Sequence, residues 1–322
     1  MEANNEEAAM AQRDKAKGKL WLPAVAFFLA AVIAAEEKTD ASQRIITFQN
    51  DPYVTADREK KEVRIKAALS PDLRAVRSIL EFLLISGVYR QETKEWEYDR
   101  GYESVFVTNA QPATIQAALL LVGFRPGALP QPAPEGLIKD NTERIGDATK
   151  VAAEGERPKA PMMDILVEWE ENGTPRCERV EIFLFDRRAG KIMANTPWAY
   201  TGSYFLTNDK NEKVMAADLT RVIAAVFYDE SALINLPYYT ENPYGGPGMG
   251  LEVFADALPP YFHQEKEIIE GVKRVKIKIP QQREVSLVLR ASELPPPSVS
   301  LPKTEEKEKS APANVKDAGA SP

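Results

Sequence analysis

The sequence predicts an α+β body in which mostly antiparallel strands are joined by few helices. Two segments near the C-terminus, 274–280 and 283–291, alternate apolar and polar residues, and a period of two is that of a half-buried strand. Asn172-Gly173 separates two further β-prone segments, and this dipeptide is a strong signal of a hairpin. A helical pattern is clear at 113–123, where Gly123 suits the C-terminal cap. The fold class follows from these three observations.

The N-terminus predicts export. Residues 1–19 are polar and end in a basic cluster, and the apolar run Leu20–Ala35 follows. A basic flank, an apolar core and small residues before a polar boundary are the parts of a secretory signal. The run is shorter than the roughly 20 residues of a full membrane span, so a signal peptide cleaved after Ala34 or Ala35 and a retained membrane anchor both stay open. In either case we expect the body to lie beyond the inner membrane, in the periplasm or outside the cytoplasm.

Composition excludes several functional classes. The net charge of −7 and the pI of about 5.2 argue against a nucleic-acid partner. Cys177 is the only cysteine and His263 the only histidine, so the chain has no internal disulfide and no four-cysteine zinc or iron–sulfur site. Cys177 has arginine neighbours, which lower a thiol pKa, but a nucleophile also needs an oriented base. We therefore expect no metal, no cofactor and no cysteine catalysis.

The first half of the body contains one ambiguous segment. Residues 36–50 are predicted as a linker, and 63–69 as a half-buried strand. Ser70-Pro71 is typical of a helix start, and that helix would continue into 79–85, which is equally apolar enough for a buried strand. The periodicity leaves both alternatives open. The segment 103–108 is predicted as a strand.

The body is expected to span 51–292 as one unit. Residues 125–161 hold six prolines, which indicates a linker or long loop that can divide the body into packed lobes, 51–127 and 162–292. The tail, 293–322, has no aromatic residue and is predicted to be disordered.

The second half is expected to be rich in strands. In 163–170 the residues Ile165, Val167 and Trp169 share one face, and 179–186 is the expected return strand of the hairpin. The remaining expectations are solvated charges at Glu168, Glu170 and Glu171, a β-prone aromatic segment at 198–206, an edge strand with a lysine-rich outer face at 274–280, and either a helix or two strands at 214–228.

Taken together, the segments resemble the YdjY-domain proteins, a poorly characterised group of exported bacterial proteins. The resemblance runs from Val63 to Ala291 and is carried by eight pieces: 80–84, 102–107, 115–127, 165–173, 198–205, 229–237, 251–260 and 283–291. It implies that 80–84 is a strand and that 214–228 holds two strands, and it implies no activity. This chain departs from the family at Tyr102, where a histidine is usual, and in the longer excursion 87–101.

Two functional hypotheses follow. The first is a non-catalytic envelope module that binds a protein, peptide or glycan partner, because aromatic side chains in loop-rich segments serve binding surfaces. The second is an envelope enzyme around Glu103, Ser104, Trp198 and Ser203, although neighbouring strand residues such as Glu103 and Ser104 point to opposite faces. The candidate partner-binding residues are Glu103, Ser104, Trp198, Tyr200, Ser203, Tyr204, Tyr238 and Tyr239.

Overall fold

A computed structural model describes seven stretches of the chain: residues 44–73, 78–128, 159–187, 189–207, 211–237, 251–253 and 255–295. The predicted signal or anchor (1–35), most of the linker 125–161 and most of the tail lie outside the described residues. None of the described helices is long and apolar enough to cross a membrane.

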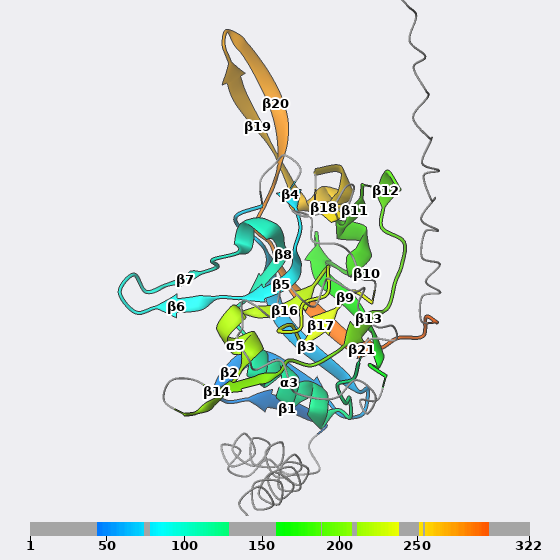
Figure 1. The fold of residues 1–322 in the computed structure, drawn as a ribbon. Helices are drawn as coiled ribbons and strands as arrows, with labels where there is room; N and C mark the ends of the chain where they lie inside the picture. Colours follow the sequence, from blue (N-terminus) through cyan, green and yellow to red (C-terminus); the bar gives the residue numbers. More distant parts are fainter. Residues whose placement is uncertain are drawn as a thin grey trace, which may run out of the picture.

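The main sheet holds eleven strands and is the frame of the molecule (Figure 1). In spatial order its strands are β1 (Ile45–Phe48), β2 (Asp51–Asp57), β3 (Glu62–Leu69), β21 (Glu284–Ala291), β9 (Met162–Glu171), β13 (Trp198–Tyr200), β17 (Ile234–Asn235), β16 (Val222–Ala225), β5 (Phe82–Ser86) and β8 (Ser104–Thr108), with β10 (Thr174–Arg179) paired to β9. Because β3 also pairs with β8, the strands from β3 round to β8 form a closed ring. Strand pairs are antiparallel except β16–β17 and β5–β8. Strands that precede the linker and strands that follow it therefore share one sheet, and the two groups pair at β3–β21 and at β5–β16.

Short elements surround this ring. Helix α3 (Pro112–Leu121) packs against β2 and β3, with Pro112 in its first turn and Gly123 at φ +102° just after its end. Helix α5 (Ala216–Thr220) lies between β15 (Lys213–Met215) and β16. The 3₁₀ turns are Gly101–Glu103, Val180–Phe183, Ala255–Ala257 and Pro260–Phe262.

Four small sheets complete the fold. One contains β12 (Lys191–Ile192), β11 (Phe185–Asp186), β18 (Leu251–Val253) and β4 (Ser78–Ile79), and another pairs β14 (Phe205–Thr207) with β15. Two hairpins leave the body: β6 (Val88–Arg90) with β7 (Glu95–Glu97), and β19 (His263–Glu270) with β20 (Lys273–Pro280) (Figure 1).

Apolar side chains pack in two clusters. The larger contains Trp198, Tyr200 and a group of edge-to-face rings, among them Phe106–Phe183 at 5.1 Å and Trp169–Phe262 at 5.4 Å between centroids. Edge-to-face pairs add stability beyond their buried area. The smaller cluster, Phe82, Ile85, Val107, Val222, Ala225 and Ala232, has Tyr98 and Phe227 packed against it.

Most predicted elements are present. The strands at 63–69, 274–280 and 283–291, the helix at 113–123 and the Asn172-Gly173 turn are confirmed. The two ambiguous segments are settled: 79–85 contains β4 and β5, and 214–228 contains two strands around the short α5.

Three predictions are wrong. Ser70 does not start a helix, because residues 71–72 form a turn and Ser70 Oγ instead donates a hydrogen bond to the Gly101 carbonyl at 2.7 Å. The return strand of the hairpin is 174–179 rather than 179–186, since the two left-handed turn residues bring Thr174 directly opposite Glu171. The predicted linker 36–50 contains β1, which pairs with β2 in the main sheet. The strand β19 was not predicted at all, because its residues show little apolar alternation.

Candidate functional site

The aromatic candidates on β13 are buried. Trp198 and Tyr200 are fully enclosed, and Trp198 Nε1 donates a hydrogen bond to Glu181 Oε1 at 2.8 Å. Glu181 also accepts from Arg179 Nε at 3.0 Å, and Arg179 Nη1 forms an ion pair with Asp164 at 2.7 Å. Burial raises the pKa of Glu181, against the lowering effect of Trp198 and Arg179. These residues connect neighbouring strands of the main sheet. The aromatic rings of Trp198 and Tyr200 are enclosed and present no face to a ligand.

The two serine candidates also have internal partners. Ser104 Oγ donates to the Phe106 carbonyl at 2.8 Å. Ser203 Oγ accepts the Ala217 N–H at 2.9 Å, at the start of α5. Burial, with Glu230 and Asp229 nearby, raises the pKa of Tyr204 to about 12. Tyr238 and Tyr239 lie outside the described residues.

Glu103 takes part in a buried cluster around an arginine. Arg100 Nε donates to Glu103 Oε1 at 2.6 Å, Arg100 Nη2 pairs with Glu81, and the guanidinium lies 4.0 Å above the Phe82 ring. Glu81 and Glu103 are only 5% and 3% exposed. Burial, and next the Glu103 charge, raise the pKa of Glu81. We refer to Arg100 with these two carboxylates as the arginine clamp.

The arginine clamp comes directly after the β6–β7 hairpin in the chain, and this hairpin carries exposed and half-buried aromatic rings. Trp96 makes edge contacts with Tyr89 at 5.6 Å and with Tyr53 of β2 at 6.2 Å. Tyr98 donates its hydroxyl to Asn109 Oδ1 at 2.7 Å. Its ring packs so closely on Gly87 that a Cβ there would lie 2.7 Å from Tyr98 Cε1.

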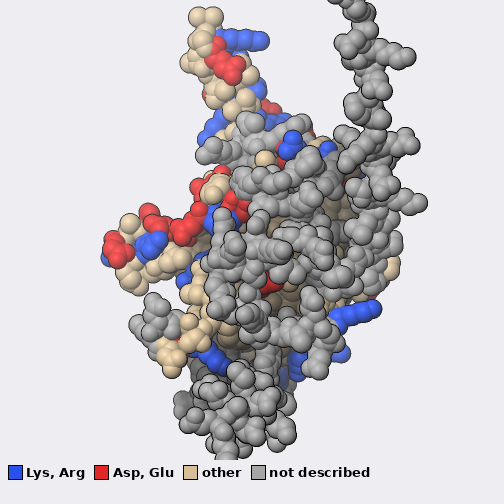
Figure 2. Space-filling model, viewed as in Figure 1, with Lys and Arg blue, Asp and Glu red and all other residues tan. Residues whose placement is uncertain are grey.

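Two hollows meet at Tyr98. The first, the acidic hollow, has a volume of about 610 Å³ and is lined by Pro71, Asp72, Glu95, Trp96, Glu97, Tyr98, Asp99 and Gln282. Its lining holds four carboxylates and no lysine or arginine among the described residues. Glu97 pairs with Arg90 at 2.6 Å, and Figure 2 shows acidic side chains along this arm of the molecule.

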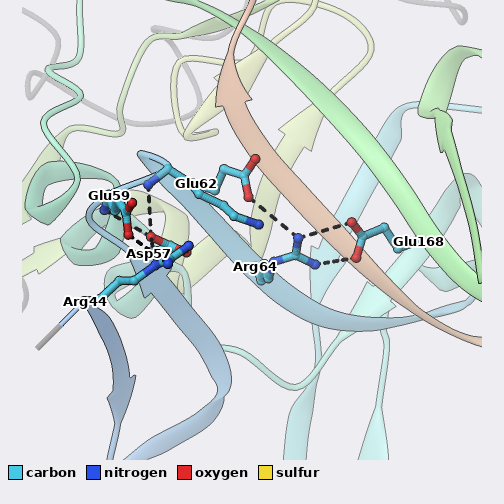
Figure 3. A network of polar contacts seen from close by, with 7 residues as sticks. Arg44, Asp57, Glu59, Glu62, Arg64 and Glu168 are labelled. Carbon is cyan, nitrogen blue, oxygen red and sulfur yellow. Dashed lines mark hydrogen bonds and ion pairs between the residues drawn. The ribbon is translucent and has the colours of Figure 1, made fainter.

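The second, the sheet hollow, has a volume of about 580 Å³ and crosses the outer face of β3, β21 and β9. Lys66, Ser286 and Glu168 lie opposite one another in register across these strands, and Tyr53 and Tyr98 also line this hollow. Glu168 was expected to be a solvated charge, but it forms a two-pronged pair with Arg64, one contact being Nη2–Oε1 at 3.2 Å (Figure 3). Arg64 thus bridges β3 and β9 across β21.

A second ion-pair group in Figure 3 closes the turn between β2 and β3. Asp57 accepts N–H groups of Glu59 and Lys60 at 3.0 Å each, and Arg44 pairs with both Asp57 and Glu59. The Lys60 N–H is the main reason that the pKa of Asp57 is lowered. This group orders the β2–β3 turn, whose strands carry Tyr53 and Lys66 into the sheet hollow.

The expectation that arginine neighbours leave the Cys177 thiol with a lowered pKa is wrong. Cys177 lies opposite Glu168 on the exposed strand β10. Partial burial and the Glu168 charge raise its pKa, and they outweigh the lowering effect of Arg290 and Arg64. The thiol is therefore less reactive than its arginine neighbours suggested. In the described part of the chain no three His, Cys, Asp or Glu side chains gather as metal ligands would.

Comparison with known proteins gives no family. No family model, curated protein or solved structure matches this chain. The resemblance to the YdjY-domain proteins stays a prediction from the sequence pieces.

Sequence reasoning missed the residues that line the two hollows, above all Tyr53, Trp96, Tyr98 and Asn109. The signal was present in the excursion 87–101, where the chain departs from the resembled pattern and reads Glu-Trp-Glu-Tyr at 95–98. Aromatic rings on a short exposed hairpin are typical of a recognition surface rather than of a core.

Proposed function

We propose that this protein is a non-catalytic envelope module that binds a basic, extended segment of a partner protein in the acidic hollow. The observation that carries the proposal is the lining of that hollow: exposed carboxylates at Asp72, Glu95 and Asp99 beside the rings of Trp96 and Tyr98, with no basic lining residue in the described part.

The chemistry favours a cationic partner. A lysine or arginine over the face of a tryptophan gains about 0.5–2 kcal/mol, depending on how far it is desolvated. Clustered carboxylates attract such a chain from a distance and orient its approach. The rings of Trp96, Tyr53 and Tyr89 brace one another, so little conformational entropy is lost when a partner binds.

The location belongs to the proposal as well. The basic flank and the apolar run at 20–35 support export, with residues 20–35 as signal or anchor. Residues 1–60 fused to a reporter that is active only after export should give activity, and the mass of the native N-terminus separates cleavage from anchoring. Full-length protein in the soluble cytosol would contradict the location.

The enzyme hypothesis has no comparable support. Trp198 binds Glu181, Ser203 caps α5, Ser104 binds a backbone carbonyl of its own strand, and Glu103 is held in the arginine clamp. None of the four lines either hollow.

The proposal is tested by titrating the full chain into fluorescein-labelled octalysine and measuring anisotropy. Trp96→Ala should weaken binding by roughly 2- to 30-fold, because one cation–π contact is lost. Tyr102→Ala is the matched control: Tyr102 is 50% exposed and lies outside the hollow, so its removal should leave the affinity unchanged.

Binding at the acidic hollow must be distinguished from attraction by the overall negative charge of the protein. Asp72→Asn with Asp99→Asn removes the same charge as Glu265→Gln with Glu267→Gln on the β19–β20 hairpin. The first pair should weaken binding much more than the second. Equal effects of the two pairs, or wild-type affinity in Trp96→Ala, would show that octalysine binds by overall charge, and the acidic hollow would be rejected as the site.

A further inference from the structure

The β19–β20 hairpin extends from the body as a free ribbon (Figure 1). Its strands pair with each other along all eight residues, and among the described strands neither pairs with a third. An isolated two-stranded ribbon is marginally stable in water. A ribbon this long, with most of its residues exposed, is therefore expected to contact something outside the described molecule.

The ribbon has two different faces. Ile268 lies opposite Val275, and the alternation of the strand places Ile277 and Ile279 on the same side. The other side carries Glu265 opposite Lys278 and Glu267 opposite Lys276. The first face is thus apolar along β20, where its side chains are half-buried, while Gln264 and Lys266 of β19 lie on the same face.

The tip carries two exposed apolar side chains. Ile269 is 72% exposed and Val272 106%, the highest values among the large apolar side chains of the described residues. In Figure 2 the end of this hairpin is formed mainly by uncharged side chains. Exposed apolar groups at the end of a projecting element mark a contact with a membrane or a partner.

The charge of the ribbon distinguishes between a membrane and a partner protein. Residues 263–280 hold five basic and three acidic side chains, a net charge of +2 in a chain whose net charge is −7. Two ion pairs, Arg274–Glu267 at 3.7 Å and Lys276–Glu265 at 3.8 Å, are long and exposed. Such pairs contribute little, so the cations remain available to another anion.

We propose that this hairpin docks on an anionic lipid surface, with Ile269 and Val272 entering the headgroup region and the basic residues of β20 facing lipid phosphates. An apolar tip with cationic flanks fits an anionic interface. The inference rests on the proposed extracytoplasmic location, where the predicted segment 20–35 brings the body close to the bilayer.

A second copy of the chain fits the hairpin less well as a binding partner. Pairing β20 with β20 would bring Lys273, Arg274, Lys276 and Lys278 of both chains together, and pairing β19 with β19 would do the same for their glutamates. Pairing β19 with β20 of another copy matches the charges, but it is head-to-tail and leaves an unpaired edge at each end.

A probe at the tip tests the proposal in the full chain, because it reports on the hairpin itself whether or not residues 20–35 insert into the vesicles. In Cys177→Ser with Val272→Cys, an environment-sensitive fluorophore is attached to the new thiol, and vesicles of phosphatidylglycerol and phosphatidylcholine in equal amounts are added. The emission should shift to the blue, and the shift should be absent with phosphatidylcholine alone. The same fluorophore on native Cys177, which lies on exposed β10, should not respond.

Neutralising the tip charges supplies the second arm. Lys273→Gln with Arg274→Gln should weaken the vesicle affinity of the tip probe at least tenfold, since each basic residue near an anionic surface contributes a factor of roughly five. An unchanged emission while the protein sediments with the anionic vesicles would overturn the proposal. An equal shift with neutral vesicles, or a shift that depends on protein concentration without vesicles, would overturn it as well. Octalysine binding should be the same in these hairpin variants, so failure here is distinguishable from failure of the acidic hollow.

Discussion

Glu81 shows how single buried carboxyls make the stability of this fold depend on pH. Burial and the neighbouring Glu103 raise its pKa above the ordinary 4.5. The folded state then binds more protons than the unfolded state above pH 4.5, so the stability that Glu81 contributes is present below that pH and is lost as the pH rises through the folded pKa.

We therefore predict that the free energy of unfolding depends less on pH in Glu81→Gln than in the wild-type protein. Relative to Glu81→Gln, the wild-type protein should lose stability as the pH rises from about 4.5 toward neutral, because only the wild type must ionise the buried Glu81. Urea unfolding of both proteins across this range measures the difference. The raised pKa values of Asp51, Glu181 and Asp218 act in the same direction, but they are common to both proteins and cancel. If the difference in unfolding free energy between the two proteins does not change with pH, or if the wild type gains stability relative to Glu81→Gln as the pH rises, the raised pKa of Glu81 is contradicted.

Trp198 belongs to the core and not to a binding surface. Trp198→Phe removes the N–H that Glu181 accepts and leaves a cavity, and it should destabilise the fold by about 2–4 kcal/mol in urea unfolding. Tyr102→Phe, at an exposed position, should change the stability by less than roughly 0.5 kcal/mol. Folded Trp198→Phe should bind octalysine normally. A loss of binding with unchanged stability would return Trp198 to the list of site residues.

At the scale of elements, the arginine clamp connects the core to the β6–β7 hairpin. Arg100→Met leaves Glu81 and Glu103 buried without their cation and should destabilise the fold by about 2 kcal/mol, less than a fully buried pair would, because Arg100 itself is 38% exposed. It should also weaken octalysine binding, although Arg100 does not line the acidic hollow.

The matched control is Arg90→Met, which removes the exposed pair with Glu97 on the same hairpin. Its stability change should be below about 1 kcal/mol. If Arg100→Met and Arg90→Met are equally mild in urea unfolding, the clamp does not hold the hairpin in place.

The elements also show what a sequence can predict. The alternation at 63–69 and 283–291 and the turn at Asn172-Gly173 report local preferences, and these elements were found. The return strand 174–179 was missed because it is exposed along most of its length and so lacks an apolar period. The apolar run 79–85 was ambiguous because β5 is buried on both faces, which removes the alternation on which the distinction depends.

The candidate site was predicted less well, for a related reason. Trp198 and Tyr200 look like loop aromatics in the sequence, but the pairing of β13 with β9 and β17 encloses them. The acidic hollow depends on contacts between distant segments, such as Trp96 with Tyr53 and Tyr98 with Asn109. No local pattern encodes such pairs. The excursion 87–101 was visible only as a departure from a resembled pattern.

At the scale of the whole molecule, the sheet shared by both sides of the linker predicts how the chain behaves when it is cut. β21 lies between β3 and β9, and β5 lies between β16 and β8, so strands from both sides of the linker share hydrogen bonds. Limited proteolysis between residues 129 and 158 should give two fragments that stay together on a sizing column in native buffer. Two separately folded fragments would contradict a single body.

The central claim is that a basic partner binds at the acidic hollow, and hydrogen–deuterium exchange with and without saturating octalysine tests it most directly. The account predicts slower exchange in β6, β7 and residues 98–101, with β13 and the β19–β20 hairpin unchanged. Protection confined to other surfaces, or no protection while octalysine remains bound, would contradict the account.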